Sequence, residues 1–304
     1  MSDAVSILMT TFNGEDYLLE QLDSIKKQTQ NNWSLWISDD GSSDNTLDII
    51  HKFRKQNKDK VFVLSGPRKG SDENFWSLIK NSSIKSEYFA FADQDDIWKE
   101  EKLEIAISKI SKVKNIPLLY CSRTEIINSA GKKIGLSPNF NKKPSFNNAL
   151  VQSIAGGNTM VFNKQTRNLL YKVPSNYEIV AHDWLTYQLV TGSGGEVIYD
   201  KTPYTKYRQH GKNQIGSNLG LFARVKRISL LLLGRFKNWN EKNILILNYL
   251  SHNFTLSSKK DLEYFINLRK NYTFRIKNIF HLKIYRQTRL GNIALIISLL
   301  INKI

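Results

Sequence analysis

Cysteine is nearly absent, since the 304 residues contain only Cys121. A single thiol excludes an internal disulfide and a cysteine-based metal cluster, and it fits a reducing compartment. No basic segment with an apolar core precedes the apolar stretch that begins at Val5, so we expect no secretory signal. The longest apolar run, 293–301, is shorter than the roughly 20 residues that span a bilayer. These absences predict a cytoplasmic protein without a membrane-spanning helix.

Acidic residues are scarce in the last part of the chain. From 219 to 304 there are 16 lysines and arginines against 3 acidic residues, so this segment carries +13 of the formal charge of +17. The asymmetry predicts a boundary near 217–220 and an anionic partner for the tail. Nucleic acid is one such partner. The basic residues stand beside long apolar stripes that a nucleic-acid surface does not need, so we expect no nucleic-acid binding.

Apolar runs alternate with helically spaced apolar positions along the first 110 residues. This alternation predicts an α/β fold, with a parallel sheet flanked by helices. Neither G-x-G-x-x-G nor G-x-x-x-x-G-K-[ST] occurs, which argues against dinucleotide oxidoreductases and P-loop nucleotidases. The predicted strands cover 5–11, 33–38, 61–65 and 88–92, and the predicted helices cover 16–28, 46–53, 72–79 and 99–110.

Three carboxylates follow the fourth predicted strand, in the stretch FADQDDIW at 91–98. Ligands of open α/β sheets bind beyond the carboxyl ends of the strands, so Asp93 and Asp95 are expected at the mouth of a crevice. Clustered carboxylates repel one another, and a hard cation such as Mg²⁺ or Mn²⁺ would neutralise them. A solvated acidic turn is the alternative. Asp96 is expected to cap the helix at 99–110.

With these pieces placed, the chain resembles glycosyltransferases of family 2, which have the GT-A fold. The matching segments are SILMTTFNGEDYLLEQLDSI, ISDDGSSDNT, FADQDDIW, AGGNTMVFN, HDW and YRQHG, in the family's order over about 5–216. The FADQDDIW form resembles rhamnosyltransferase-like bacterial members, which build surface polysaccharides. The resemblance implies a GT-A, Rossmann-like, mostly parallel sheet over 1–218. Its nucleotide-binding half would cover about 1–98 and its acceptor half about 99–218, and 219–304 would form a basic helical extension.

The resemblance implies that the sugar-nucleotide donor contacts Thr11, Asp39, Arg68, Asp93 and Gly157. Thr11 and Asp39 would line the pyrimidine pocket, although Asp39 can also cap a turn. The Arg68 guanidinium would meet donor phosphate, with a solvated arginine as the alternative. Asp93 would face the ribose or a metal-bound water. Gly157 would let the backbone approach the donor sugar, or it belongs to a simple turn.

The same resemblance implies metal ligands and a catalytic base. Asp95 would hold Mg²⁺ or Mn²⁺ against the donor diphosphate. His210 would bind the metal or the diphosphate, although a lone histidine is often structural. Asp183 would take the proton of the acceptor hydroxyl, or it only caps the helix predicted from Trp184 to Val190. Asn158, His182 and Trp184 would border the acceptor.

The tail has helically spaced apolar positions over 221–236 and 279–301, with basic residues between them. Basic amphipathic helices of this kind lie on anionic membrane surfaces, which would suit an acceptor carried on a polyprenyl diphosphate. The alternative is a helical subdomain that packs on the catalytic domain or on a second copy in a homodimer.

The predicted function is inverting, metal-dependent transfer of L-rhamnose from dTDP-L-rhamnose to a growing surface polysaccharide. The protein would act in the cytoplasm, as a peripheral protein on the inner face of the cell membrane. A UDP-hexose or UDP-N-acetylhexosamine donor is the alternative within the family. A non-catalytic sugar-nucleotide binder is a further alternative, against which Asp39, Asp93, Asp95 and Asp183 argue together.

Overall fold

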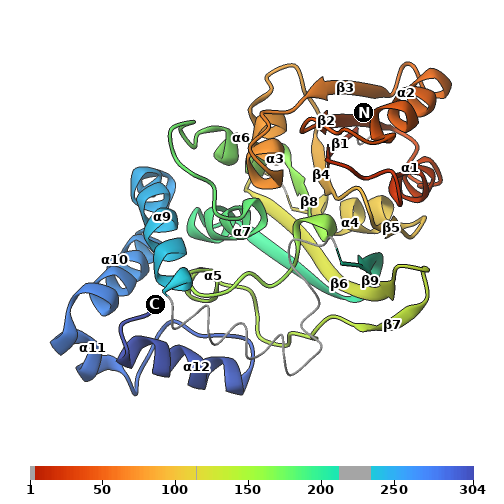
Figure 1. The fold of residues 1–304 in the computed structure, drawn as a ribbon. Coiled ribbons are helices and arrows are strands. Elements are labelled where there is room, and N and C mark those ends of the chain that lie inside the picture. The colour runs from red at the N-terminus through yellow and green to blue at the C-terminus, as the bar shows by residue number, and fades with distance from the viewer. Residues whose placement is uncertain (1–3, 114, 212–233) are drawn as a thin grey trace.

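The computed structural model describes residues 4–113, 115–211 and 234–304. Within these ranges helices flank a nine-stranded sheet, whose order is β3-β2-β1-β4-β8-β6-β9-β5, with β7 beside β6 (Figure 1). The strands are β1 Val5–Thr11, β2 Trp33–Asp39, β3 Val61–Ser65, β4 Tyr88–Ala92, β5 Ile97–Trp98, β6 Leu118–Asn128, β7 Lys133–Leu136, β8 Val161–Asn163 and β9 Glu196–Gln209. The main helices are α1 Leu18–Lys26, α2 Thr46–Gln56, α3 Ser71–Lys80, α4 Lys102–Ile110, α5 Phe146–Ala149, α6 Lys164–Tyr171, α7 His182–Gly192, α9 Arg235–Tyr249, α10 Leu256–Lys270, α11 Tyr272–Asn278 and α12 Arg289–Leu300, with short 3-10 turns at Gly157–Thr159 and Ser251–Asn253.

The first four strands form a parallel sheet with β1 at its centre. All seven residues of β1 are buried, as expected for a strand covered by helices on both faces. One hydrophobic cluster joins α1, α2 and α4 to one face of the sheet, and a second joins α3, α6 and α7 to the other. The four predicted strands agree with the structure to within one residue, and the α/β, GT-A-like fold is confirmed.

Two long strands in the second half, β6 and β9, were not predicted. They run parallel to each other, and the short strand β8 runs antiparallel to both β4 and β6. The two-residue strand β5 pairs with β9, so that Ile97 lies opposite Lys206. This pairing brings the loop that follows β4 next to the carboxyl end of β9. The distant segments FADQDDIW and YRQHG therefore meet because of sheet topology.

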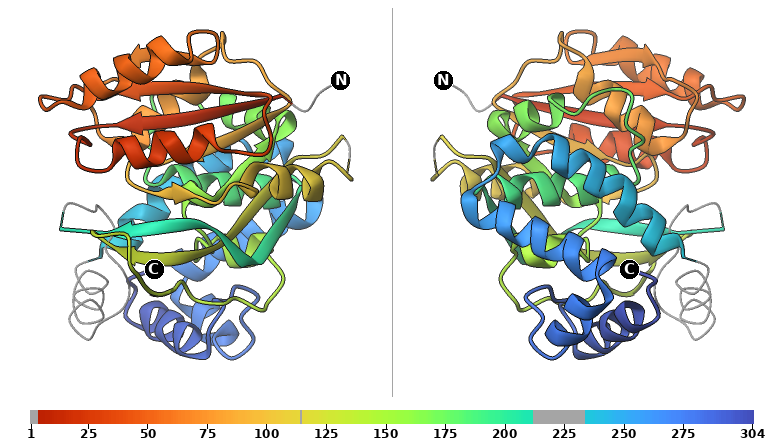
Figure 2. Two further views of the ribbon diagram at one scale, coloured as in Figure 1. Left: turned by 90° about the vertical axis from the view of Figure 1, so that its right-hand side faces the viewer. Right: turned by 90° about the vertical axis from the view of Figure 1, so that its left-hand side faces the viewer.

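The C-terminal helices α9 and α10 pack against α7 and α5 (Figures 1 and 2). Buried residues of α9, α10 and α12, among them Leu247, Leu268 and Leu299, share one hydrophobic cluster with Phe146 and Leu189. This shared core supports the alternative in which the extension packs on the catalytic domain. The boundary predicted near 217–220 lies outside the described residues.

The helix boundaries predicted for the tail need correction. The prediction of one helix over 279–301 is wrong in its first part, because α12 begins only at Arg289. Thr288 is its N-cap, and the Thr288 Oγ1 accepts a hydrogen bond from the backbone N–H of Gly291. The other predicted helix, 221–236, lies outside the described residues up to 233. No helix in the described part of the chain is long and apolar enough to cross a membrane.

Candidate functional site

The acidic loop after β4 combines two half-buried carboxylates, Asp93 and Asp95, with a third that is fully buried. Burial, reinforced by the neighbouring charge of Asp95, raises the pKa of Asp93 to about 7. The charge of Asp183 contributes to this rise, while His182 and Lys102 act against it. A carboxyl whose pKa is moved this far at the edge of a sheet is typical of a functional site. Asp93, Asp95 and Asp183, predicted from separate positions in the motifs, therefore lie close enough to interact.

Asp96 does not cap the following helix, so that prediction is wrong. α4 begins at Lys102, and its N-cap residue is Glu101. Asp96 is instead completely buried, and its carboxylate accepts hydrogen bonds from Asn158 Nδ2 at 2.5 Å and from the backbone N–H of Arg208 at 3.3 Å. The residue ties three segments together beneath the site. Local helix signals favour a cap here, whereas the pairing of β5 with β9 turns the side chain inward.

Asp95, just before β5, lies next to His210, which directly follows β9. The Asp95 Oδ2 lies 2.8 Å from His210 Nε2, and both side chains keep some exposure, 16% and 11%. The His210 ring also packs on Tyr17, with 4.8 Å between the ring centroids. The two predicted metal ligands are thus neighbours in the structure, although a long stretch of sequence separates them.

The side chains of Asp95 and His210 together could bind a divalent cation. Asp95 offers carboxylate oxygens, which Mg²⁺ and Mn²⁺ prefer as ligands, and His210 adds an imidazole nitrogen. Burial is the main cause of the raised pKa of Asp93 and the charge of Asp95 adds to it, and a bound cation would favour the ionised form of the carboxyl. Within the described residues, however, no three His, Cys, Asp or Glu side chains are already grouped as a metal site. If a metal binds here, these two residues would supply part of its ligands, and oxygens of the sugar nucleotide and water would supply the rest.

Arg208 supports this junction, and the sequence analysis missed it. Its side chain is buried, with Nε donating to the backbone carbonyl of Asp95 at 3.0 Å and Nη2 to Glu20 at 2.7 Å. The guanidinium also lies over the Tyr17 ring, 4.6 Å from the centroid. Arg208 therefore holds the backbone of Asp95 in place from below. Its position within the YRQHG segment could have identified it as a site residue.

The ends of β1 and β2 bring Thr11 and Asp39 together, as expected from adjacent parallel strands. Thr11 pairs with Asp39 in the strand register, and Thr11 Oγ1 donates to Asp39 Oδ2 at 2.9 Å. Asp39 also accepts from the backbone N–H groups of Gly41 and Ser42 and from the Ser42 hydroxyl. The turn-capping role left open by the sequence is present. The role in the pyrimidine pocket stays a prediction.

Arg68 lies in the loop between β3 and α3, which the end of β2 holds in place. The carboxylate of Asp40 accepts hydrogen bonds from the backbone N–H groups of Arg68 at 2.6 Å and Gly70 at 2.8 Å. The backbone of Arg68 has a φ of +59°. Its side chain lies over Gly41, because a Cβ built on Gly41 would lie 3.0 Å from Arg68 Nε. The guanidinium is thus positioned next to the turn that follows Asp39, on the predicted nucleotide side of the site.

His182 and Asp183 occupy the first turn of α7, which begins two residues earlier than predicted. The backbone N–H and Nδ1 of His182 both contact Asp72 Oδ1, at 2.9 Å and 2.8 Å. The ring of His182 stacks on Phe75, with 4.1 Å between centroids. Asp72 was not predicted as a site residue, because in the sequence it indicated only the start of a helix. These contacts fix the backbone that carries Asp183.

Neighbouring groups shift the pKa of Asp183 in opposite directions. Burial raises its pKa above the usual range, and the negative charge of Asp72 adds to this. His182 and hydrogen bonds from the backbone N–H groups of Trp184 and Gly157 lower it. A carboxylate with a raised pKa is a stronger base, so it accepts a proton from a hydroxyl more readily. The role of Asp183 as the catalytic base stays a prediction.

Gly157 approaches His182 so closely that no side chain fits. A Cβ built on Gly157 would lie 2.3 Å from His182 Nε2. The Gly157 N–H also donates to the Asp183 carboxylate. The close backbone approach predicted for the paired glycines is present, but the partner that we can identify is His182. Contact with the donor sugar stays a prediction.

Replacing Gly157 by alanine should therefore destabilise the protein. We expect Gly157→Ala to lower the free energy of unfolding by about 1–3 kcal/mol, because the added methyl displaces a ring held by Phe75 and Asp72. Gly211→Ala is the matched control, since a Cβ there meets nothing within 4 Å. It should stay within about 0.5 kcal/mol in urea denaturation. Equal stability of the two variants would contradict the steric argument.

Asn158 and a buried lysine complete the floor of the site. Lys102 is fully buried, and its Nζ donates to the backbone carbonyl of Asn158 at 2.6 Å. The ammonium also lies 3.3 Å from the centroid of the Trp98 ring. Burial lowers the pKa of Lys102 well below its usual range, while Asp96 and Asp93 act in the opposite direction. The sequence analysis missed Lys102 because a lysine in a helix normally lies in solvent.

Trp184 lies away from these polar groups. Its side chain is buried, and the indole Nε1 donates to the backbone carbonyl of Ala149 at 2.6 Å. The ring stacks parallel to Phe236, with centroids 5.9 Å apart, and meets Trp239 edge-on at 6.5 Å. These contacts join α7 to α9. The acceptor role suggested for Trp184 stays a prediction, without a contact that supports it.

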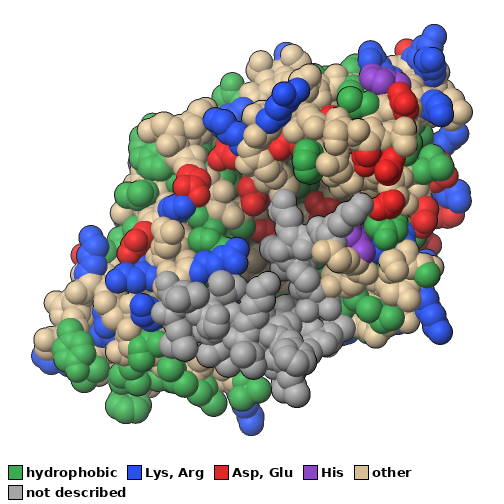
Figure 3. Space-filling view, in the orientation of Figure 1, with side chains coloured by type: hydrophobic (Ala, Val, Ile, Leu, Met, Phe, Trp, Pro, Cys, Tyr) green, Lys and Arg blue, Asp and Glu red, His purple; other side chains and the backbone are tan. Residues whose placement is uncertain are grey.

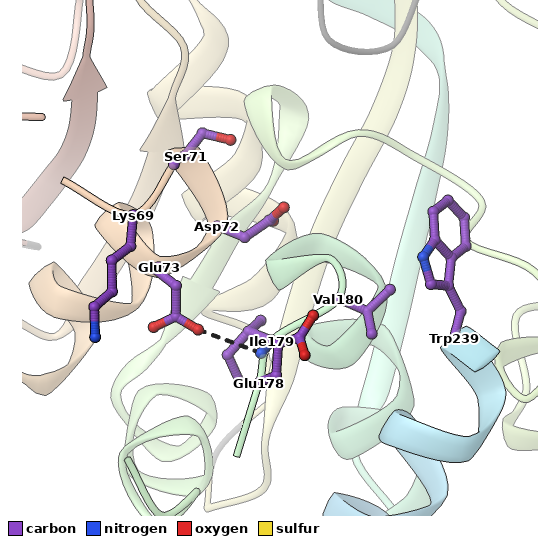
Figure 4. A pocket seen from close by; sticks show the side chains of 9 residues that line it. Lys69, Ser71, Asp72, Glu73, Glu178, Ile179, Val180 and Trp239 are labelled. Atoms are coloured by element: carbon purple, nitrogen blue, oxygen red, sulfur yellow. Dashed lines mark hydrogen bonds between the residues drawn. The ribbon is translucent and has the colours of Figure 1, made fainter. Parts of the chain in front are cut away.

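A pocket of about 290 Å³ opens beside the start of α7 (Figure 4). Its wall includes Asp72, whose carboxylate contacts His182. Glu73 on α3 accepts a hydrogen bond from the backbone N–H of Ile179, which closes one side, and Trp239 on α9 faces the other. Acidic side chains gather around the central hollow of this face (Figure 3). The pocket thus connects the surroundings of the predicted base to the C-terminal extension.

Comparison with known proteins identifies the family. The glycosyl transferase family 2 profile matches residues 6–169. The dTDP-rhamnosyl transferase RfbG of Shigella flexneri is 30% identical over 269 residues, which cover 86% of this chain and 90% of that protein. WfgD of Escherichia coli is a UDP-Glc:alpha-D-GlcNAc-diphosphoundecaprenol beta-1,3-glucosyltransferase. It is 36% identical over 126 residues, which cover 41% of this chain and 47% of WfgD.

A solved structure supports the fold. Residues 1–349 of TarS from S. aureus, in complex with UDP-GlcNAc, superpose with a TM-score of 0.57 at 19% identity. The match covers 92% of this chain and 76% of that chain. A profile that spans more than half of the chain, a relative matched over most of its length and a shared fold lead to one conclusion. The chain belongs to glycosyl transferase family 2 and is a glycosyltransferase.

Proposed function

We propose that this protein transfers L-rhamnose from dTDP-L-rhamnose, with inversion, to a lipid-linked acceptor of surface-polysaccharide assembly. The observation that carries the mechanism is the meeting of Asp93, the Asp95–His210 pair and Asp183 at one edge of the sheet. The similarity to RfbG over most of both chains supports the donor. The name of WfgD, whose acceptor is a diphosphoundecaprenol, supports the lipid-linked acceptor.

The proposed reaction is one displacement. The acceptor hydroxyl oxygen forms a bond to the anomeric carbon of the donor as the bond to the nucleoside diphosphate breaks. The hydroxyl proton passes to Asp183, and both electrons of the broken bond leave with the diphosphate. Attack from the face opposite the leaving group inverts the anomeric centre, and no covalent intermediate with the protein forms.

Each part of the site has a task in this scheme. Asp72 and Gly157 hold His182 and Asp183 on the acceptor side, next to the pocket that ends at Trp239. Thr11 and Asp39 receive the base of the nucleotide. Asp95 and His210 would hold Mg²⁺ or Mn²⁺, which would neutralise charge on the departing diphosphate. Asp93, next to Asp95, orients the ribose or a bound water.

The first test is donor hydrolysis by purified protein across a panel of sugar nucleotides, with Mn²⁺, Mg²⁺ or chelator. We expect slow release of dTDP from dTDP-rhamnose that requires the metal. Asp95→Asn should reduce this release by about 100-fold, because it removes a predicted metal ligand. Release that persists unchanged in the chelator and in Asp95→Asn would contradict the metal role. Release only from UDP-sugars would contradict the rhamnosyl donor and leave the reaction type intact.

Nucleotide binding separates the two donor classes without an acceptor. A ligand that binds only the native state raises the melting temperature, so dTDP should raise it by several degrees more than UDP at equal concentration. The alternative donor, a UDP-hexose or UDP-N-acetylhexosamine, has support from the UDP-sugars of WfgD and TarS. A larger shift with UDP would favour that alternative. Asp39→Asn should reduce the shift with either nucleotide if Asp39 contacts the base.

A further inference from the structure

Helix α12 is apolar on the side that faces solvent as well as on the side that faces the core. Its inner face buries Leu295 and Leu299 in the hydrophobic cluster of the acceptor half. Its outer face exposes a stripe of apolar residues at helical spacing, which continues to the C-cap residue Ile301. The exposed fractions are Leu290 77%, Ile293 54%, Ile297 49%, Leu300 50% and Ile301 40%. A helix that is apolar all round is normally buried on all sides. The outer stripe of α12 is therefore a candidate contact surface.

The stripe extends beyond α12 onto the preceding segments. In the loop before the helix Phe280 is 89% exposed, and on α11 Tyr272 and Ile276 are 68% and 39% exposed. Figure 3 shows hydrophobic side chains along the lower left of the molecule, over α11 and α12 as labelled in Figure 1. Contiguous exposed apolar patches mark protein or membrane contacts on soluble proteins. We call α11, the loop 279–288 and α12 together the C-terminal apolar face.

The charge around this face identifies its partner. Residues 264–304 contain eight lysines and arginines and no aspartate or glutamate. Lys277, Lys283 and Arg289 are exposed alongside the apolar side chains. The apolar side chains alone would fit a second protein copy equally well. The partner must therefore accept an apolar surface and a positive rim at the same time.

A second copy of this chain would accept the apolar surface but not the positive rim. In a two-fold dimer the same patch faces itself, so basic residues would meet basic residues. Like charges brought together in an interface oppose association. An anionic bilayer instead offers acyl chains to the apolar stripe and negative headgroups to the rim. The charge distribution thus decides between the two partners.

We propose that the C-terminal apolar face docks on an anionic lipid bilayer, with α12 lying in the plane of the interface. The side chains of Phe280, Leu290, Ile293 and Ile297 would enter the acyl boundary, and Lys283 and Arg289 would contact headgroups. This inference goes beyond the proposed chemistry and does not depend on the donor. It would hold the acceptor half of the enzyme at the surface from which a lipid-linked acceptor projects.

The test is co-sedimentation of the full-length protein with vesicles of phosphatidylcholine containing about 30 mol% phosphatidylglycerol. We expect binding that weakens in high salt and on pure phosphatidylcholine vesicles. The double variant Ile293→Glu/Ile297→Glu should bind at least about tenfold more weakly, because each change places a carboxylate in the bilayer interface. Ile134→Glu is the matched control, since Ile134 on β7 is 51% exposed and lies outside this face. It should bind like the unchanged protein.

Two results would overturn the inference. One is equal sedimentation of the double variant and the Ile134→Glu control. The other is a dimer in light scattering that Ile297→Glu converts to monomer, which would make this face a subunit interface. The melting-temperature shift with dTDP, measured without vesicles, should be the same in the unchanged protein, the double variant and the control. A failure of membrane docking can thus be distinguished from a failure of the proposed sugar transfer.

Discussion

Asp183→Asn should reduce sugar transfer by about 10²- to 10⁴-fold, the range that a general base contributes. The amide keeps the size of the side chain and can still accept hydrogen bonds from the N–H groups of Gly157 and Trp184. It cannot take up the proton of the acceptor hydroxyl. The melting-temperature shift with the donor nucleotide should be unchanged, because the proposed mechanism assigns Asp183 to the acceptor hydroxyl and not to the nucleotide. Transfer is measured with radiolabelled dTDP-rhamnose and membranes from the protein's own host as the source of acceptor.

The control for this variant addresses the alternative that Asp183 serves only its helix. Asp48 is an acidic residue in the first turn of α2, a helix on the opposite face of the sheet from α7. Asp48→Asn loses a similar favourable interaction with the helix dipole, about 0.3–1 kcal/mol. If Asp183→Asn showed only a comparable loss of stability and retained transfer, the residue would be a helix-stabilising aspartate and the base would have to be sought elsewhere.

Lys102→Met should lower the free energy of unfolding by about 3–5 kcal/mol, the usual cost of removing one partner of a buried charge network. Methionine keeps most of the volume of the lysine stem. It leaves the Asn158 carbonyl without this donor and removes a buried cation near Asp93 and Asp96. It also ends the cation–π contact with the Trp98 ring. Urea denaturation followed by circular dichroism measures the change.

Lys109 supplies the matched control on the same helix. Its Nζ pairs with Asp200 at 2.6 Å, but its side chain is 40% exposed. The Asp200 side chain is only 8% exposed, but it would keep the hydrogen bonds from the Tyr120 hydroxyl and the Thr202 N–H, so Lys109→Met should cost less than Lys102→Met. If Lys102→Met were as stable as Lys109→Met, the buried lysine would not support the site.

The local sequence was sufficient for the nucleotide-binding half. Each of the first four strands is a short apolar run, and together they form the parallel core between two layers of helices. Such strands can be predicted from the local sequence, without knowledge of contacts to distant segments. For the same reason the meeting of Thr11 with Asp39 follows from the ends of two adjacent parallel strands. The positions of Asp93 and Asp95 follow from the end of the fourth strand.

Local reasoning failed where a residue's neighbours come from distant segments. Asp96 has the sequence context of a helix cap, yet Asn158 and Arg208 turn it into a buried carboxylate. Lys102 has the context of a solvated helix position, and Asp72 that of a first-turn acid. In each case the decisive partner comes from a different element far along the chain. Propensity and periodicity carry no information about such partners.

The sequence by itself determined the family, the parallel core and the residue types at the site, because motifs and apolar runs are local properties. It also determined the positive charge of the tail. Only the tertiary structure decided which of these residues meet: β5 pairs with β9 and so joins Asp95 to His210. Packing likewise decided which side of α12 is covered. The core buries only Leu295, Ser298 and Leu299 from this helix, and the equally apolar opposite side is left exposed to solvent.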